Sequence, residues 1–154
     1  MTHIYQGDYD LCLKLADDFY KVAQSVTPDP FEILDHSAYP YAINMSFACE
    51  LYLKALAIKF SQNNEFEGTH DLWDLYHKLP VTVQLDIRNN YEDDDYRDRL
   101  EQFLDEDRKV FVEWRYPFAN GQRIGDLYFS DFQLFAEALI RTIQIAKSSE
   151  ISKL

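Results

Sequence analysis

The sequence contains few of the residues that interrupt helices or staple small domains together. It has only four glycines and five prolines in 154 residues, which favours long helices joined by few tight turns. Its two cysteines, Cys12 and Cys49, both lie within apolar helical patterns. We expect them to be small buried hydrophobic residues in a reducing compartment, although the sequence leaves a bridge between them open.

Long apolar runs and an excess of basic charge are also missing. No segment approaches the roughly 18 uncharged residues that a membrane span needs. The N-terminus lacks the basic and apolar regions of a signal peptide, so we expect a cytoplasmic protein with no membrane partner. The formal net charge of −12 opposes indiscriminate nucleic-acid binding, because such binding depends on neutralising phosphates. The fifteen Lys and Arg residues still allow a local basic groove.

The chain is rich in residues that build a core. Hydrophobic residues make up 47% of it and aromatic residues 16%, which excludes a disordered tail. Residues 1–154 therefore read as a single domain, large enough to bury a core without a metal or disulfide.

Apolar residues at helical spacing predict an all-α bundle of four to six helices with no sheet. The predicted helices are Asp8 to about Val26, a long second helix with Pro40 in its first turn, a short third helix capped by Thr69, Val81–Tyr91, about five turns from Tyr96 to Trp114, and a last helix from the capping box at Ser130 to about Lys147. The segments Gln62–Gly68 and Tyr116–Phe129 are predicted loops. Val81–Tyr91 also alternates as a strand would, so a strand is the alternative there.

The second predicted helix is apolar on nearly every side. The segment Asn44–Phe60 (NMSFACELYLKALAIKF) leaves almost no polar face, so it belongs in the middle of the bundle. It nevertheless carries Glu50 and Lys54 one turn apart, where they can pair. A buried ion pair costs desolvation and is weak evidence for stability, which invites a functional interpretation.

Two interpretations of this pair follow from the residues. A structural ion pair, completed by Asn44 or by an arginine from another helix, is the one that the residues alone favour. The functional alternative places the pair beside His70 and Arg115 in one cleft. There Arg115 would bind a phosphate, and a carboxylate or imidazole would move a proton.

One spacing resembles a metal site. His70, Asp74 and His77 lie at i, i+4 and i+7, where three ligands could meet on one helical face. A polar outer face opposite the apolar stripe of the third helix explains the same pattern, and we favour that interpretation. No phosphate-binding glycine loop or paired-cysteine motif is present, so no metal and no cofactor is expected.

Three segments together resemble the HEPN superfamily, the small all-α domains named for higher eukaryotes and prokaryotes nucleotide-binding. They are ACELYLKAL (Ala48–Leu56), GTHDLWDLY (Gly68–Tyr76) and FVEWRYPFA (Phe111–Ala119). In that family a helix with an E-x-x-x-K-like pattern precedes a G-H-D-L-like turn, and many members then show an R-Y-P-like segment before the last helix. The match runs in order from about Ala38 to Ile145.

The resemblance implies an up-and-down helical bundle that forms a homodimer with a polar cleft near the dimer interface. Family members are often ribonucleases in toxin–antitoxin, phage-defence or RNA-processing systems, and others bind nucleotides, RNA or a partner protein. Possible protein partners are a nucleotidyltransferase or an antitoxin. The residues of this chain that match the motifs, and so would bind a ligand, are Glu50, Lys54, His70, Asp71, Arg115 and Tyr116.

The chain departs from the family's ribonuclease pattern. The nuclease members carry an arginine followed a few residues later by a histidine, and no arginine here is followed by a histidine at that spacing. The leading hypothesis is therefore a HEPN-type domain of a bacterial defence or stress system that binds RNA, a nucleotide or a partner protein. The alternatives are a metal-independent endoribonuclease using Arg115, Glu50, Lys54 and His70, and an adaptor or antitoxin-like module whose acidic segment Tyr91–Asp107 docks onto a basic partner.

Overall fold

The most apolar segment of the sequence forms the central helix of the fold. The computed structural model describes residues 3–26, 38–91, 99–115 and 129–152. Its elements are β1 (Ile4–Gln6), α1 (Tyr9–Ser25), α2 (Ala38–Phe60), β2 (Glu65–Glu67), α3 (Leu72–His77), α4 (Val81–Asn90), α5 (Arg99–Glu106), α6 (Val110–Glu113) and α8 (Phe129–Ser152). The expected all-α bundle is confirmed.

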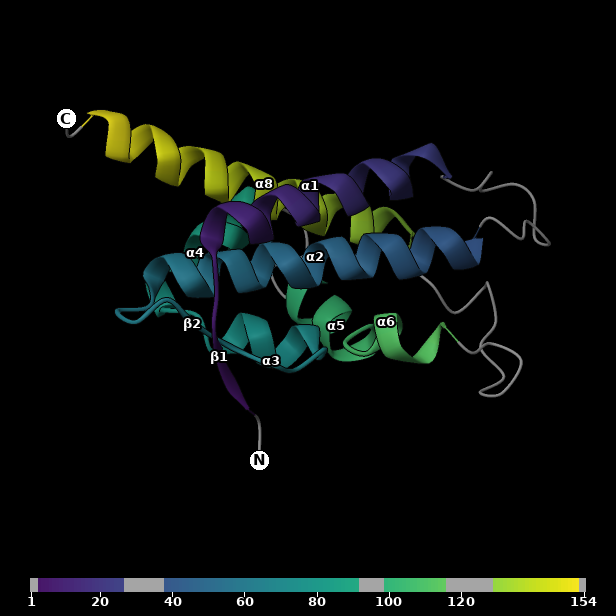
Figure 1. Ribbon diagram of the computed structural model, residues 1–154. Helices are drawn as coiled ribbons and strands as arrows, with labels where there is room; N and C mark the ends of the chain where they lie inside the picture. Colours follow the sequence, from purple (N-terminus) through teal and green to yellow (C-terminus); the bar gives the residue numbers. More distant parts are fainter. Residues whose placement is uncertain (1–2, 27–37, 92–98, 116–128, 153–154) are drawn as a thin grey trace.

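Helix α2 runs through the middle of the bundle. Helices α1 and α8 lie along one side of it, and the short helices α3, α5 and α6 lie on the other (Figure 1). Helix α1 runs antiparallel to α2, whereas α8 runs in the same direction as α2, and α4 packs against α8. Ala48, Cys49, Leu53 and Leu56 of α2 are completely buried, so the apolar sequence of this helix is explained by burial on all sides.

Helix α1 begins and ends close to where its sequence predicts. The Asp8 side chain accepts a hydrogen bond from the backbone N–H of Leu11 at 3.1 Å and so caps the N-terminus. Of the apolar residues whose spacing predicted this helix, Ala16 and Ala23 are buried, whereas Leu15 and Val22 are exposed. Helix α1 therefore presents an apolar side to solvent as well as one to the core.

A two-stranded sheet is the one element type that the sequence did not predict. Strand β1 pairs antiparallel with β2, with Tyr5 opposite Phe66, inside the segment predicted as the loop Gln62–Gly68. Each strand has only three residues, which is too short for alternation of polar and apolar residues to show. A side chain at Gly7, where the strand turns into α1, would collide with Ile58 and Phe66, so glycine allows the sheet to lie close against α2.

Two predicted helix boundaries were wrong. The N-cap of α3 is Asp71 and not Thr69, because the Asp71 side chain accepts from the backbone N–H of Asp74, while Thr69 Oγ1 accepts from the N–H of Asp71. The last helix begins at Phe129, one residue before Ser130, and continues to Ser152. Helix α4 forms as predicted, and the strand alternative does not.

The predicted five-turn helix is divided into α5 and α6. The chain leaves the helix at Asp107–Lys109, which frees the carbonyl of Arg108 to accept the backbone N–H of Leu72 at 2.9 Å, at the start of α3. A periodic apolar pattern continues across this break, so the sequence could not reveal it. Tyr96 and residues 116–128 of the predicted loop Tyr116–Phe129 lie outside the described residues.

The break between α5 and α6 contains a buried acid. Asp107 is 4% exposed, and its Oδ2 atom has no hydrogen-bond partner among the described residues. Burial raises the pKa of Asp107 to about 7, and the nearby carboxylates of Glu106, Asp131 and Glu113 add to the effect. This carboxyl group therefore holds its proton to a higher pH than an exposed aspartate does.

Candidate functional site

A single buried carboxylate joins the two predicted motifs on α2 and before α3. Glu50 is 1% exposed. Its Oε2 atom accepts a hydrogen bond from Lys54 Nζ at 3.0 Å, and its Oε1 atom lies 2.8 Å from His70 Nδ1. Lys54 belongs to the same helix, whereas His70 comes from the turn that precedes α3. The structure thus brings together three residues that the sequence singled out. The residue that joins the Glu50–Lys54 pair is a histidine, whereas the structural interpretation named Asn44 or an arginine from another helix.

The pairing fixes which nitrogen of His70 faces outward. A carboxylate that is paired with an ammonium group is ionised and only accepts hydrogen bonds, so the proton of a neutral His70 ring lies on Nδ1. The Nε2 atom then carries a lone pair, and it has no hydrogen-bond partner among the described residues. The His70 side chain is 48% exposed, so the ring is accessible to a ligand in solution.

An aromatic ring connects His70 to Arg115. The ring of Phe111 on α6 lies 5.4 Å from the His70 ring, and the Arg115 guanidinium lies 4.8 Å from the centre of the Phe111 ring. Phe47 of α2 stacks on Phe111 at 4.5 Å and holds it against the body of the protein. We call Glu50, Lys54, His70, Phe111 and Arg115 the His70 cluster. Two of these residues, Lys54 and Arg115, bring positive charge to it.

The surroundings of Lys54 are apolar on the side away from Glu50. Its Nζ atom lies 5.6 Å from the centre of the Phe66 ring on β2, so the small sheet covers one end of the cluster. Cys12 of α1 is a neighbour, and its Sγ–H donates to the carbonyl of Leu51 at 3.2 Å. Burial raises the pKa of the Cys12 thiol to about 11, so Cys12 is a poor nucleophile. Both cysteines are free thiols, and the alternative of a bridge is not realised.

Two of the predicted ligand-binding residues are not placed in the cluster. Asp71 is buried, caps α3 and accepts two hydrogen bonds from Arg108 Nε, at 2.8 and 3.0 Å. Arg108 also reaches Asp74 at 3.3 Å and lies over the ring of Trp73, so this second charged group fastens α3 to the α5–α6 break. Tyr116 lies outside the described residues.

The two histidines and the aspartate whose spacing resembles a metal site make separate contacts. His70 binds Glu50, Asp74 pairs with Arg108, and His77 Nε2 lies 3.1 Å from Glu101 Oε2. His70 also precedes the helix, so the three residues do not share one helical face. No group of three or more His, Cys, Asp or Glu side chains within the described ranges is arranged to hold a metal ion.

Sequence reasoning missed the aromatic residues that organise the site. Phe111 lies in the predicted helix from Tyr96 to Trp114 and opens the segment Phe111–Ala119, but the sequence gives it no role in a site, and Phe66 lies in the predicted loop Gln62–Gly68. Phe111 lies four residues before Arg115, a spacing that can place a ring beside a guanidinium, although α6 ends at Glu113. Phe66 carried no signal, because its position follows from a sheet that the sequence did not predict.

Comparison with protein-family models, curated proteins and solved structures gives no significant match. Among the helices that the structure describes, none has the length and apolar character needed to cross a membrane.

Proposed function

We propose that this protein is a HEPN-type helical domain that binds the phosphate groups of RNA or of a nucleotide at the His70 cluster. The observation that carries the proposal is the double use of Glu50, whose buried carboxylate holds Lys54 and His70 at the same time. A carboxylate used only for stability has no need of an exposed imidazole. Here it orients a ring that is about half exposed to solvent.

The charge of the cluster suits a phosphate ligand. Glu50 pairs with Lys54, and the exposed side chain of Arg115 carries a second positive charge beside the Phe111 ring that contacts His70. A guanidinium binds two phosphate oxygens at once, and the protonated form of the imidazole, which carries a second proton on Nε2, donates a hydrogen bond to a phosphate oxygen. The net charge of −12 works against this attraction at long range, so we expect binding to depend on this local contact and to weaken with salt.

Removal of the arginine should therefore weaken RNA binding. We expect Arg115→Ala to reduce the affinity for a fluorescently labelled single-stranded oligoribonucleotide about tenfold, since a charged hydrogen bond to phosphate contributes roughly 1.5 kcal/mol. Fluorescence anisotropy at 50 mM salt measures the effect. The slope of log affinity against log salt should also become shallower by about 1 in the variant.

Lys147→Ala provides the matched control for this experiment. It removes the same charge from an exposed position near the end of α8, and Figure 1 places that end at the opposite side of the molecule from α6. The proposal predicts normal binding in the control. Equal loss in both variants would mean that only net charge matters, and a wild-type protein that binds neither RNA nor nucleotide would refute the proposed function.

A metal-independent ribonuclease is the second candidate, and the pairing of Glu50 with His70 is the observation that favours it. A carboxylate that orients an imidazole is the arrangement in which a histidine serves as a general base. Here Nε2 of His70 would take the proton of a ribose 2′-hydroxyl, Arg115 would hold the scissile phosphate, and Lys54 would stabilise developing charge. Cleavage would then proceed without the usual Arg–His motif of the nuclease members.

The same labelled oligoribonucleotide distinguishes the two candidates when it is incubated with the protein in the presence of EDTA and then separated on a gel. A nuclease should cleave the oligoribonucleotide, and His70→Gln should slow cleavage at least about 100-fold, because general acid–base catalysis contributes on that order. Intact RNA that is bound by the wild-type protein would exclude the ribonuclease and retain the binding function.

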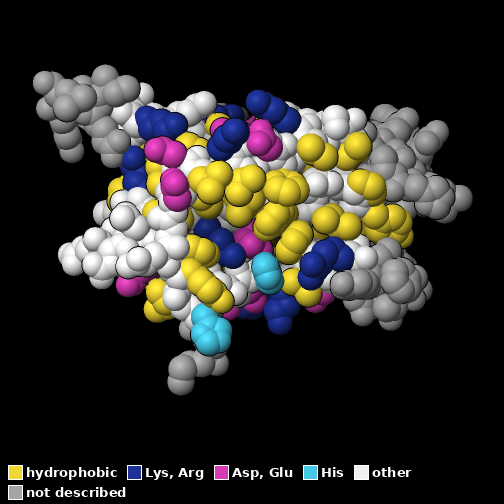
Figure 2. Space-filling model, in the orientation of Figure 1, with side chains coloured by type: hydrophobic (Ala, Val, Ile, Leu, Met, Phe, Trp, Pro, Cys, Tyr) yellow, Lys and Arg dark blue, Asp and Glu magenta, His cyan; other side chains and the backbone are white. Residues whose placement is uncertain are grey.

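We further propose that the protein acts as a homodimer through the exposed side of α1. Leu11, Leu15 and Val22 are 54%, 41% and 46% exposed and follow one another at helical spacing. Figure 2 shows hydrophobic side chains gathered along α1 and α2, directly beside Lys, Arg and His side chains. A two-fold contact on this face would bury an apolar patch and bring two His70 clusters close together.

A charge introduced into this face should prevent dimerisation. We expect Leu15→Glu to sediment as a monomer at micromolar concentrations at which the wild-type protein sediments as a dimer, because a contact of two copies would bury both carboxylates. Lys14→Glu, a change at the neighbouring exposed position, is the control. A monomeric wild-type protein would contradict the proposed dimer and leave the binding test unaffected.

A further inference from the structure

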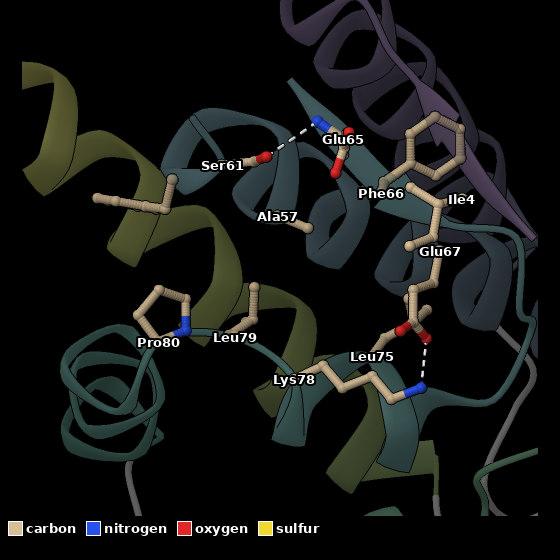
Figure 3. Close-up of a pocket in the computed structure, with 11 residues that line it drawn as sticks. Ile4, Ala57, Ser61, Glu65, Phe66, Glu67, Leu75, Lys78, Leu79 and Pro80 are labelled. Atoms are coloured by element: carbon tan, nitrogen blue, oxygen red, sulfur yellow. Dashed lines mark hydrogen bonds and ion pairs between the residues drawn. The ribbon is translucent and has the colours of Figure 1, made fainter. Parts of the chain in front are cut away.

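An apolar pocket lies between the two-stranded sheet and the end of α2, and none of the His70 cluster lines it. Its volume is about 370 Å³, which is within the range of small-molecule sites. Figure 3 shows Leu75, Leu79 and Pro80 on one side of the space, Ala57 behind it, and the strand residues opposite. The walls are mainly apolar, so a ligand would need an apolar body.

Three charged residues line the pocket, and two of them pair with each other, which leaves one carboxylate without a counter-ion. Lys78 of the pocket rim pairs with Glu67, and this hydrogen bond raises the pKa of Lys78. Glu65 also lines the pocket, and its carboxylate has no ion-pair or hydrogen-bond partner among the described residues. The backbone N–H of Glu65 donates to Ser61 Oγ at 3.1 Å, which fixes Glu65 at the end of α2.

We propose that this pocket binds a small primary amine that carries an aromatic or aliphatic body. The body packs against Ala57, Leu75 and Leu79, and the ammonium group pairs with Glu65 at the rim. Charge complementarity selects a cation, because the one lysine in the pocket is already neutralised by Glu67. An anionic ligand would meet the uncompensated carboxylate and be repelled.

The proposal is tested with 2-phenylethylamine as the probe and with phenylacetate as a probe of similar shape and opposite charge. Amide chemical shifts of the ¹⁵N-labelled full chain report the binding. We expect saturable shifts at Ser61, Leu75 and Lys78 with the amine at millimolar concentration and none with the acid. Absence of saturable shifts with the amine, or equal shifts with both probes, would overturn the proposal.

Three variants distinguish a specific binding site from a general attraction of amines to an acidic protein. Glu65→Gln should weaken amine binding about tenfold, because a charge-assisted hydrogen bond becomes a neutral one. Glu106→Gln removes the same charge from an exposed position on α5 and should leave the affinity unchanged. Ala57→Leu should fill the pocket and abolish binding. Equal affinities of Glu65→Gln and Glu106→Gln would overturn the assignment of Glu65, and unchanged binding by a folded Ala57→Leu protein would exclude this pocket.

Discussion

Replacement of Glu50 by alanine is expected to lower the free energy of unfolding by about 3–5 kcal/mol, the range typical of removing one partner from a buried ion pair. The side chain of Lys54 is only 9% exposed, and Glu50 is the acidic group that accepts its hydrogen bond. Without the carboxylate, the ammonium group would be left near the ring of Phe66, which compensates only a small part of the lost pairing. Urea denaturation followed by circular dichroism measures the change.

A double variant distinguishes the ion pair from the space that it fills. Glu50→Leu combined with Lys54→Met removes both charges and keeps most of the volume, so its stability should return to within about 1 kcal/mol of the wild type or exceed it. The double variant should also lose the orientation of His70 and, with it, RNA binding. If Glu50→Ala unfolded at the wild-type urea concentration, the ion pair would not be buried as described.

Replacement of Asp107 by asparagine should have the opposite effect and should depend on pH. A rise of the carboxyl pKa from 3.8 to about 7 corresponds to about 4 kcal/mol of destabilisation when the group is ionised in the folded protein. The folded protein holds this proton more tightly than the unfolded chain does. The cost is therefore absent below pH 3.8, grows as the pH rises and is complete above pH 7.

Asparagine has the size of aspartate but never ionises, so it avoids this cost. The free energy of unfolding of Asp107→Asn, measured relative to the wild type, should be about 4 kcal/mol higher at pH 8 than at pH 4. Asp105→Asn, which removes an exposed carboxylate at the end of α5, two residues before Asp107, controls for net charge. Parallel wild-type and Asp107→Asn stability curves between pH 4 and pH 8 would show that Asp107 is not buried without a partner.

The elements that the sequence predicted well are those with a long periodic signal. Helices α1, α2 and α4, and the existence of α8 though not its bounds, follow from apolar spacing, caps and proline positions, because helix formation and burial act on the same local pattern. The division between α5 and α6 has no such signal. It depends on a tertiary hydrogen bond from Leu72 to Arg108, which a reading of neighbouring residues cannot detect.

The candidate site was predicted in part for the same reason. Glu50 and Lys54 lie one turn apart, so their pairing is local, and the functional interpretation of the pair placed His70 beside them. Asp71 was predicted as a ligand but is occupied by Arg108, which lies far away in the sequence. The aromatic ring that joins His70 to Arg115 depends on how α6 packs against α2, and this arrangement exists only once the bundle has folded.

The pairing of β1 with β2 has a consequence for the order in which the chain folds. It joins Tyr5 to Phe66 and so closes a loop that contains all of α1 and α2. Closing a disordered loop of roughly sixty residues costs entropy that three residue pairs do not recover. Once α1 has docked along α2, the ends of the loop are already close and that entropy has been lost. The sheet therefore forms late in folding and is among the first parts of the native protein to open, and the cover over Lys54 opens with it.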